Sequence, residues 1–300
     1  MNAENKYPLV SIIMPTYNRE ALIGETIDSI LRQTFHDWEL LIIDDGSEDK
    51  TGELVNRLVD PRIIFYKAGR HGIGGRIKNI GLQMAKGAFI AFADSDDPWQ
   101  ETKLQKQLDA IKDFPDAGFC LTGGYIFETP GQPIEFFYKS KTGLKYGDLF
   151  VDCFRSEVAL FAQALMFRKE CIDEVGFFKE VKSFSDIDFI ANLAYHYKGV
   201  VIYEPLVFRR MHDDNYIHDN WEKSYHEGVE FIKANKHRLP RRVVQEALFR
   251  LYINFGEAQI RRKNKSAALS SFMSAWKHKP ATIIPIKKSL KAIFKSHISS

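Results

Sequence analysis

The sequence is poor in cysteine, in net charge and in long apolar runs, and each shortage excludes a class of protein. Its three cysteines, Cys120, Cys153 and Cys171, are an odd number without a CxxC spacing, which argues against a disulfide framework or zinc site and favours reduced thiols in a cytoplasmic protein. A formal net charge of +3 over 300 residues gives no reason to expect a nucleic-acid partner. No stretch approaches the roughly 18 apolar residues of a membrane-spanning helix, and the start "MNAENKYP" does not resemble a secretory signal.

Charge is distributed unevenly along the chain. Residues 261–300 contain ten Lys or Arg and no Asp or Glu, whereas the preceding 260 residues contain 32 basic and 39 acidic side chains. Such an asymmetry marks a change of domain. We therefore expect a main domain over residues 1–220 and a helical, basic C-terminal extension over 221–300.

The first 120 residues alternate between short apolar runs and segments of helical spacing. The apolar runs cover 9–14, 39–44, 62–66 and 88–93. Apolar residues recur at helical spacing in the segments between them: Ile23, Ile27, Ile30 and Leu31; Leu54, Leu58 and Val59; Ile77, Ile80 and Met84. This alternation predicts an α/β fold with a mainly parallel, mixed sheet flanked by helices. Further along, 123–143 is typical of a hairpin with a turn at Pro130-Gly131, and 200–204 of a strand.

Three polar clusters follow predicted strands: "PTYNR" (15–19), "DDGS" (44–47) and "DSDD" (94–97). In an open α/β sheet, ligands bind outside the carboxyl ends of the strands, so the clusters point to one crevice. The three carboxylates of "DSDD" are tolerable together if a cation lies among them, and carboxylate oxygens are what Mg²⁺ prefers. The alternative is a solvated turn in which Asp96 or Asp97 caps a helix that begins at Pro98.

The other two clusters also have plain structural interpretations. Ser47 could cap the helix near Thr51, and Asn18 could cap the preceding helix. Tyr17, however, is an aromatic residue on which a nucleobase could stack. The segment "RHGIGGRIKNIG" (70–81) is neither a GxGxxG fingerprint nor a Walker loop, yet its cations and helix start could meet phosphates.

Two later segments could carry chemistry. "FSDIDF" (184–189) places Asp186 and Asp188 before an apolar helix, either as acids favoured by the helix dipole or as a general base. "RRMHDDNYIH" (209–218) is either a solvated loop or a lid with a phosphate contact or metal ligand.

Taken in order, these stretches resemble the family-2 inverting glycosyltransferases of the GT-A fold. The motifs "VSIIMPTYNRE", "TIDSILRQTFHDWELLIIDDGSEDKT", "KNIGLQMAKGAFIAFADSDDPW" and "FSDIDFIANLA" carry the resemblance over roughly residues 7–215. It implies a nucleotide-diphosphate sugar donor, a UDP-sugar in our interpretation, and Mn²⁺ or Mg²⁺ as cofactor.

The resemblance also implies roles for residues of the first two clusters. Pro15, Thr16 and Tyr17 would line the nucleoside, with Arg19 nearby. Asp45 would accept a hydrogen bond from the base.

For the metal and diphosphate, Asp94 and Asp96 would be the outer aspartates of the DxD pattern. Asp96 and Asp97 are assigned as a pair to the metal and ribose, and His212 would lie close to the diphosphate and metal.

The remaining implied roles concern phosphate binding and catalysis. Arg76 and Lys78 would share the phosphate contact, with lysine where the family usually has arginine. Asp186 would be the catalytic base, preceded by Ser185 where the family usually has glutamate, which puts the role of that glutamate in doubt.

The acceptor implied by the resemblance is a saccharide or lipid-linked saccharide of cell-surface polysaccharide, O-antigen or glycolipid assembly. The basic amphipathic pattern of 281–300 would suit peripheral contact with the inner face of the cytoplasmic membrane, or a helix docked on the core. Two rival functions are a catalytically inactive glycosyltransferase-like scaffold and a nucleotidyltransferase.

Overall fold

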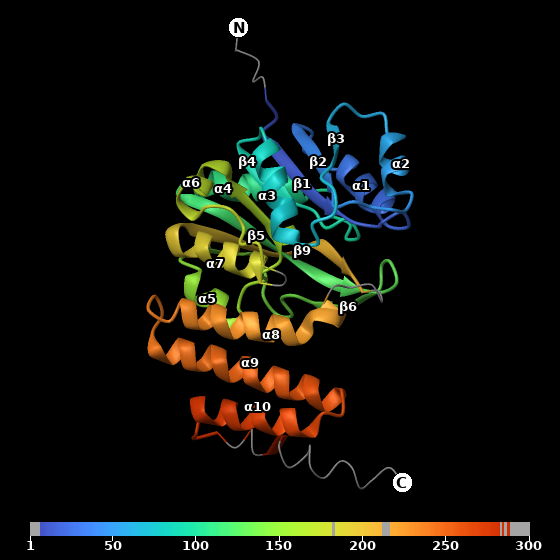
Figure 1. The fold of residues 1–300 in the computed structure, drawn as a ribbon. Helices are drawn as coiled ribbons and strands as arrows, with labels where there is room; N and C mark the ends of the chain where they lie inside the picture. Colours follow the sequence, from blue (N-terminus) through green and yellow to red (C-terminus); the bar gives the residue numbers. More distant parts are fainter. Residues whose placement is uncertain (1–6, 182–183, 212–216, 283, 285–286, 289–300) are drawn as a thin grey trace. The chain divides into compact units, whose positions relative to one another are not determined.

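The computed structural model describes residues 7–181, 184–211, 217–282, 284 and 287–288 (Figure 1). The chain forms two compact units. The first spans residues 1–153 and 158–215, and the second spans 154–157 and 216–300. The expectation that 1–220 and 221–300 are separate domains stays a prediction.

The described part of the first unit contains a nine-stranded sheet with the order β3-β2-β1-β4-β8-β5-β9-β7, and β6 pairs with β5. The strands are β1 (Val10–Thr16), β2 (Trp38–Asp44), β3 (Ile63–Lys67), β4 (Phe89–Phe92), β5 (Ala117–Phe127), β6 (Pro133–Phe136), β7 (Leu144–Gly147), β8 (Leu165–Arg168) and β9 (Lys198–Arg210).

Strand direction changes in the middle of this sheet. β1 pairs in parallel with β2 and β4, and β2 with β3, as the alternation of strands and helices predicts. β8 then lies antiparallel between β4 and β5, while β5 and β9 run parallel to each other. The mixed α/β sheet is thus confirmed, and its parallel character is concentrated in β1–β4.

Helices cover both faces of the sheet. Those wholly within the first unit are α1 (Ile23–Leu31), α2 (Thr51–Asn56), α3 (Gly74–Met84), α4 (Lys103–Asp113), α6 (Ile172–Val175) and α7 (Ser185–His196). α5 (Phe150–Arg155) begins in the first unit, and its last two residues are assigned to the second. Successive side chains of a strand point to opposite faces. Ile12 and Met14 of β1 accordingly belong to one buried cluster with residues of α1, α2 and α4, whereas Ile13 lies against Gly81 of α3 on the other face.

Two details differ from the sequence-based expectation, and one agrees with it. The predicted helix through Leu58 and Val59 ends earlier, since α2 stops at Asn56 and both side chains are exposed. Helical geometry is also disfavoured at Asp60, because that residue precedes Pro61. The predicted strand 200–204 is only part of the longer β9. The hairpin with a turn at Pro130-Gly131 is confirmed by the antiparallel pairing of β5 and β6.

The second unit is helical, with α8 (Ile217–Ala234), α9 (Arg241–Arg261) and α10 (Lys265–His278). α9 and α10 share a small core that contains Ile253, Ala268, Phe272 and Ala275. Most of the predicted amphipathic segment 281–300 lies outside the described residues. Within the described part of the chain, we find no helix with the length and apolar character needed to cross a bilayer.

The packing of α3 on β1 gives a direct stability prediction. A Cβ added at Gly81 would lie 2.4 Å from Cγ2 of Ile13. Gly81→Ala should therefore lower the free energy of unfolding by about 1–2 kcal/mol, because overpacking outweighs the gain in helix propensity. Gly24→Ala in α1 is the matched control, because nothing lies within 4 Å of its added Cβ. Urea unfolding gives the change in free energy of unfolding of each variant relative to wild type, and Gly81→Ala should be clearly more destabilising than Gly24→Ala. Equal changes in the two variants would contradict this packing.

Candidate active site

The three polar clusters meet at one edge of the sheet. The parallel strands β1 and β2 end at Thr16 and Asp44, and β4 ends at Phe92 just before the third cluster. Side-chain contacts then tie the clusters together: the Asn18 amide donates to Ser47 Oγ at 2.9 Å, and Arg19 Nε donates to Asp96 Oδ2 at 3.1 Å. The three clusters predicted to lie together are therefore neighbours, with Pro15 and Thr16 as the last residues of β1.

Asn18 and Ser47 serve this junction rather than a helix terminus. The residue before α1 is Leu22 and the residue before α2 is Lys50, so neither capping interpretation holds. Asn18 has φ 48°, and its Oδ1 accepts from the Glu48 amide at 2.9 Å. These bonds fix the loop after β1 against the loop after β2.

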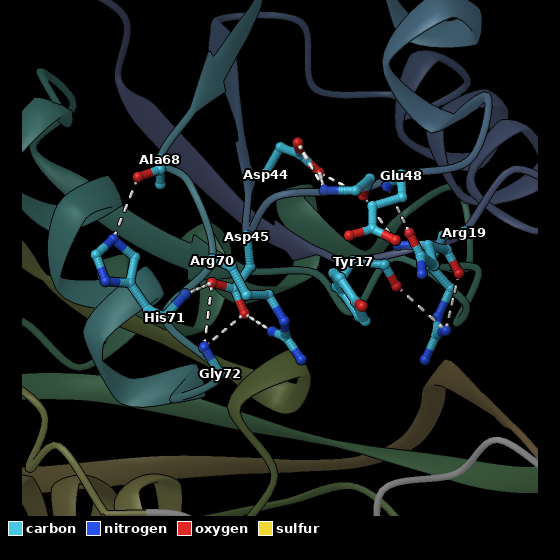
Figure 2. A network of polar contacts seen from close by, with 11 residues as sticks. Tyr17, Arg19, Asp44, Asp45, Glu48, Ala68, Arg70, His71 and Gly72 are labelled. Atoms are coloured by element: carbon cyan, nitrogen blue, oxygen red, sulfur yellow. Dashed lines mark hydrogen bonds and ion pairs between the residues drawn. The ribbon is translucent and has the colours of Figure 1, made fainter.

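Asp45 is the centre of a dense set of hydrogen bonds (Figure 2). Its carboxylate accepts from the backbone amides of His71, at 2.5 Å, and Gly72, at 3.0 Å. It also pairs with the guanidinium of Arg70, and that guanidinium lies over the Tyr17 ring, 3.7 Å from its centroid. The two predicted nucleoside residues are thus neighbours, joined by an arginine to which the sequence assigned no place at the base.

Asp97 is buried, with 4% of its surface exposed. Its two oxygens accept from Gln163 Nε2 at 2.8 Å and from the Arg210 amide at 2.7 Å. Because α4 begins only at Lys103, the interpretation of this turn as a cap for a helix beginning at Pro98 is wrong. Burial, together with the charges of Asp96 and Asp94, raises the pKa of Asp97 well above its ordinary value.

Asp94 lies among charges of both signs. Burial raises its pKa to about 6, the ammonium of Lys78 opposes that rise, and the carboxylates of Asp96 and Asp186 add to it. The guanidinium of Arg209 also lowers it. Closely spaced carboxylates such as these favour the binding of a cation among them.

Lys78 connects α3 to the predicted catalytic base. Its Nζ donates to Asp186 Oδ1 at 2.5 Å, and only 7% of Lys78 is exposed. Asp188, two residues further along α7, instead pairs with Lys179 at 2.7 Å. Arg76 does not join Lys78: it is exposed and lies 4.0 Å from Glu180. The two cations predicted to share the phosphate role are therefore on different sides of α3.

The carboxylates present suit a divalent cation only in part. Among the described residues, no three His, Cys, Asp or Glu side chains converge on a point that could hold a metal ion. Mg²⁺ commonly takes one or two protein carboxylates and completes its shell with water and substrate phosphates. Asp94 and Asp96 fit that pattern, although Asp96 Oδ2 also accepts from Arg19, whereas both oxygens of Asp97 accept hydrogen bonds from Gln163 and the Arg210 amide. His212, the other predicted ligand, lies outside the described residues.

Comparison with known proteins identifies the chain. The model of the family "Glycosyl transferase family 2" matches residues 11–170, which is more than half of the sequence. The chain belongs to glycosyl transferase family 2. This match includes β1 to β4 and the "DSDD" turn, and it ends before Asp186.

Relatives and solved structures agree with this family. The chain is 46% identical over 101 residues to the UDP-Glc:alpha-D-GlcNAc-diphosphoundecaprenol beta-1,3-glucosyltransferase WfgD of Escherichia coli, a match that covers 33% of the chain and 40% of WfgD. The chain spans about half the length of the curated relatives it matches, with 58% for a relative from Bacillus subtilis.

Two solved structures share the fold. One is S. aureus TarS 1–349 in complex with UDP-GlcNAc, with a TM-score of 0.68 and 18% identity over 94% of this chain and 88% of that one. The other is the mannosyltransferase PcManGT of Pyrobaculum calidifontis with GDP-Man and Mn²⁺, with a TM-score of 0.58 and 19% identity over 97% of this chain and 82% of that one. At these identities the likeness establishes the GT-A fold alone.

Sequence reasoning missed two partners of Asp97. Arg210 stood in the noted cluster "RRMHDDNYIH", but nothing in the sequence shows that its backbone amide reaches Asp97. Gln163 has no motif around it at all. Its Nε2 faces Asp97, and its Oε1 has no hydrogen-bond partner among the described residues.

This arrangement predicts that Asp97→Asn stabilises the fold at neutral pH. The pKa of Asp97 is raised in the folded state, so its contribution favours folding below its ordinary pKa of 3.8 and is lost as pH rises. Asparagine stays neutral, and a flipped Gln163 amide could accept from it. The free energy of unfolding of the variant, relative to wild type, should rise by at least about 1 kcal/mol between pH 4 and pH 8, equivalent to roughly one pKa unit.

Asp109→Asn, at an exposed position on α4, is the control and should show no such rise. If the difference in free energy of unfolding between Asp97→Asn and wild type does not change with pH, as in the control, then Asp97 is readily ionised where it lies.

Proposed function

We propose that this family-2 chain is a metal-dependent, inverting glycosyltransferase that moves a sugar from a UDP-sugar to a hydroxyl of a saccharide or lipid-linked saccharide. The observation that carries the proposal is the Lys78–Asp186 ion pair beside Asp94, at the edge of the sheet where the three strand-end clusters meet. It supplies a positioned carboxylate next to a site suited to a cation and a diphosphate.

The donor would lie along the ends of β1, β2 and β4. Tyr17 would stack on the base, Asp45 would accept from it, and Pro15 and Thr16 would form the adjacent wall. Arg19 is held by Asp96 at 3.1 Å and would stand between the nucleoside and the carboxylates.

Asp94 and Asp96 would hold the divalent cation, with Asp97 fixing the turn through its bonds to Gln163 and to the Arg210 amide. A bound Mn²⁺ or Mg²⁺ would supply Lewis-acid stabilisation of the departing diphosphate. PcManGT was solved with Mn²⁺, which supports a metal in this fold.

Asp186 would take the proton of the acceptor hydroxyl. The acceptor oxygen then attacks the anomeric carbon from the face opposite the nucleotide, the bond from that carbon to the diphosphate breaks, and the configuration inverts. Lys78 holds Asp186 in place through its short contact to Oδ1. The neighbouring Ser185 is buried and its Oγ lies 3.3 Å from the same oxygen, so it would help to orient the carboxylate where glutamate is absent.

The acceptor class rests on relatives. WfgD is named for a diphosphoundecaprenol-linked acceptor, so an acceptor of that chemistry at a membrane surface is proposed for this chain as well. The basic segment 281–300 would then serve as a peripheral contact with anionic lipid. Assembly of a cell-surface polysaccharide or glycolipid is the process that such a transfer would serve.

Asp186→Asn tests the base. We expect kcat to fall by about 10²–10⁴-fold, the usual contribution of a general base, while UDP binding stays near the wild-type value. Asp188→Asn is the matched variant, because it removes the other carboxylate of the same helix turn, one paired with Lys179. Loss of turnover in Asp188→Asn with activity retained in Asp186→Asn would transfer the role to Asp188.

The donor and the metal can be tested together by thermal unfolding. A UDP-sugar at 100 times its Kd with Mn²⁺ should add about 2.7 kcal/mol of stability, enough to raise Tm by roughly 5 °C or more. EDTA should remove most of that shift, and Asp96→Asn should show little of it. Stabilisation that is equally large in EDTA would contradict the metal assignment, and no stabilisation by any UDP-sugar would contradict the donor class.

A further inference from the structure

The guanidinium of Arg70 makes the two contacts proposed for the nucleobase of the donor. Its carbon lies 3.7 Å from the centroid of the Tyr17 ring, and its Nη1 pairs with Asp45 Oδ2 (Figure 2). A flat face against Tyr17 and an N–H directed at Asp45 are also what uracil offers, through its ring and its N3–H. Arg70 therefore imitates a base in the subsite proposed to receive one.

The arginine and a base cannot occupy this subsite together. A separation of 3.7 Å between the guanidinium carbon and the ring centroid is that of two planar groups in contact, which leaves no layer free between them. Because one guanidinium makes both contacts, a base that stacks on Tyr17 and donates to Asp45 has to displace it from both. We propose that Arg70 is a placeholder in the nucleobase subsite, which swings out when the donor binds. This inference rests on the proposed function.

The loop that carries Arg70 is held by its backbone, so only the side chain needs to move. The donors to Asp45 from His71 and Gly72 are backbone amides, so these bonds do not involve the Arg70 side chain. Gly46, at φ +78°, packs closely against the backbone of this loop, because an added Cβ would lie 2.8 Å from the backbone nitrogen of Arg70. The Arg70 side chain, by contrast, is 51% exposed. Displacement thus leaves Asp45 oriented and the loop intact.

A placeholder lowers the apparent affinity for the base by the fraction of molecules in which the subsite is open. It also keeps Tyr17 and Asp45 in place before the donor arrives. Only a ligand that replaces both contacts compensates for the loss of the Arg70 pair, so the residue would contribute to specificity for planar bases with an N–H edge.

The experiment compares uridine and UDP binding to the full chain and its variants by calorimetry or NMR titration, with Mn²⁺ present. Uridine is the key probe because it carries no charge of its own. Arg70→Ala should bind uridine about three- to tenfold more tightly than wild type, the size expected for a half-exposed ion pair and a cation–π contact. Arg70→Lys, which retains charge but not the planar face, should fall between them.

Salt supplies a second readout. Raising NaCl from about 50 to about 500 mM screens the Arg70–Asp45 pair. The affinity of wild type for uridine should therefore be higher at high salt than at low salt, whereas the affinity of Arg70→Ala should be the same at both. Arg57→Ala, at an exposed arginine beyond the end of α2, is the matched control and should behave as wild type in both tests.

Unchanged or weaker uridine binding by Arg70→Ala overturns the placeholder, and weaker binding would make Arg70 a direct contact of the base. UDP binding to wild type in that case leaves the donor proposal standing. Failure of both proteins to bind UDP overturns the donor class and the placeholder together.

Discussion

Four carboxylates, those of Asp94, Asp96, Asp97 and Asp186, lie near enough to one another that their charges help to raise the pKa of Asp94 or Asp97. Like charges in a partly desolvated place repel, and the fold has to offset that repulsion. Arg19 pairs with Asp96, Lys78 pairs with Asp186, and Arg209 lowers the pKa of both Asp94 and Asp97. These three cations come from three different segments of the chain, the loop after β1, α3 and β9, and all three lie near the carboxylate cluster.

The sheet explains why the cluster forms where it does. Parallel strands β1, β2 and β4 bring their carboxyl ends to one edge, where backbone groups are no longer used in the sheet and polar turns can face a ligand. α3 and α7 then add Lys78 and Asp186 from one face, and the far end of β9 adds Arg209 and the Arg210 amide. The proposed function needs such a place, in which a negatively charged donor and a basic carboxylate can coexist.

Much of this could be predicted from the sequence because it depends on local pattern. Strand and helix periodicity gave β1 to β4, and three polar clusters after strands gave the crevice. The pairing of Lys78 with Asp186 could not be foreseen, since the two are 108 residues apart and lysine beside a glycine-rich loop suggests phosphate. The position of Arg76 away from Lys78 could not be foreseen either, because side chains two positions apart on a helix point to different faces. The antiparallel insertion of β8 and the bond from Gln163 to Asp97 likewise depend on long-range packing. The site roles themselves remain predictions.

The most direct test of the central claim is the position of a Mn²⁺ ion, measured by anomalous diffraction from crystals of the full chain grown with UDP and Mn²⁺. We predict a manganese peak beside the carboxylates of Asp94 and Asp96, with the diphosphate as its other ligand and the uracil against Tyr17. A manganese ion bound away from the "DSDD" turn, with the diphosphate remote from Asp94 and Asp96, would contradict it.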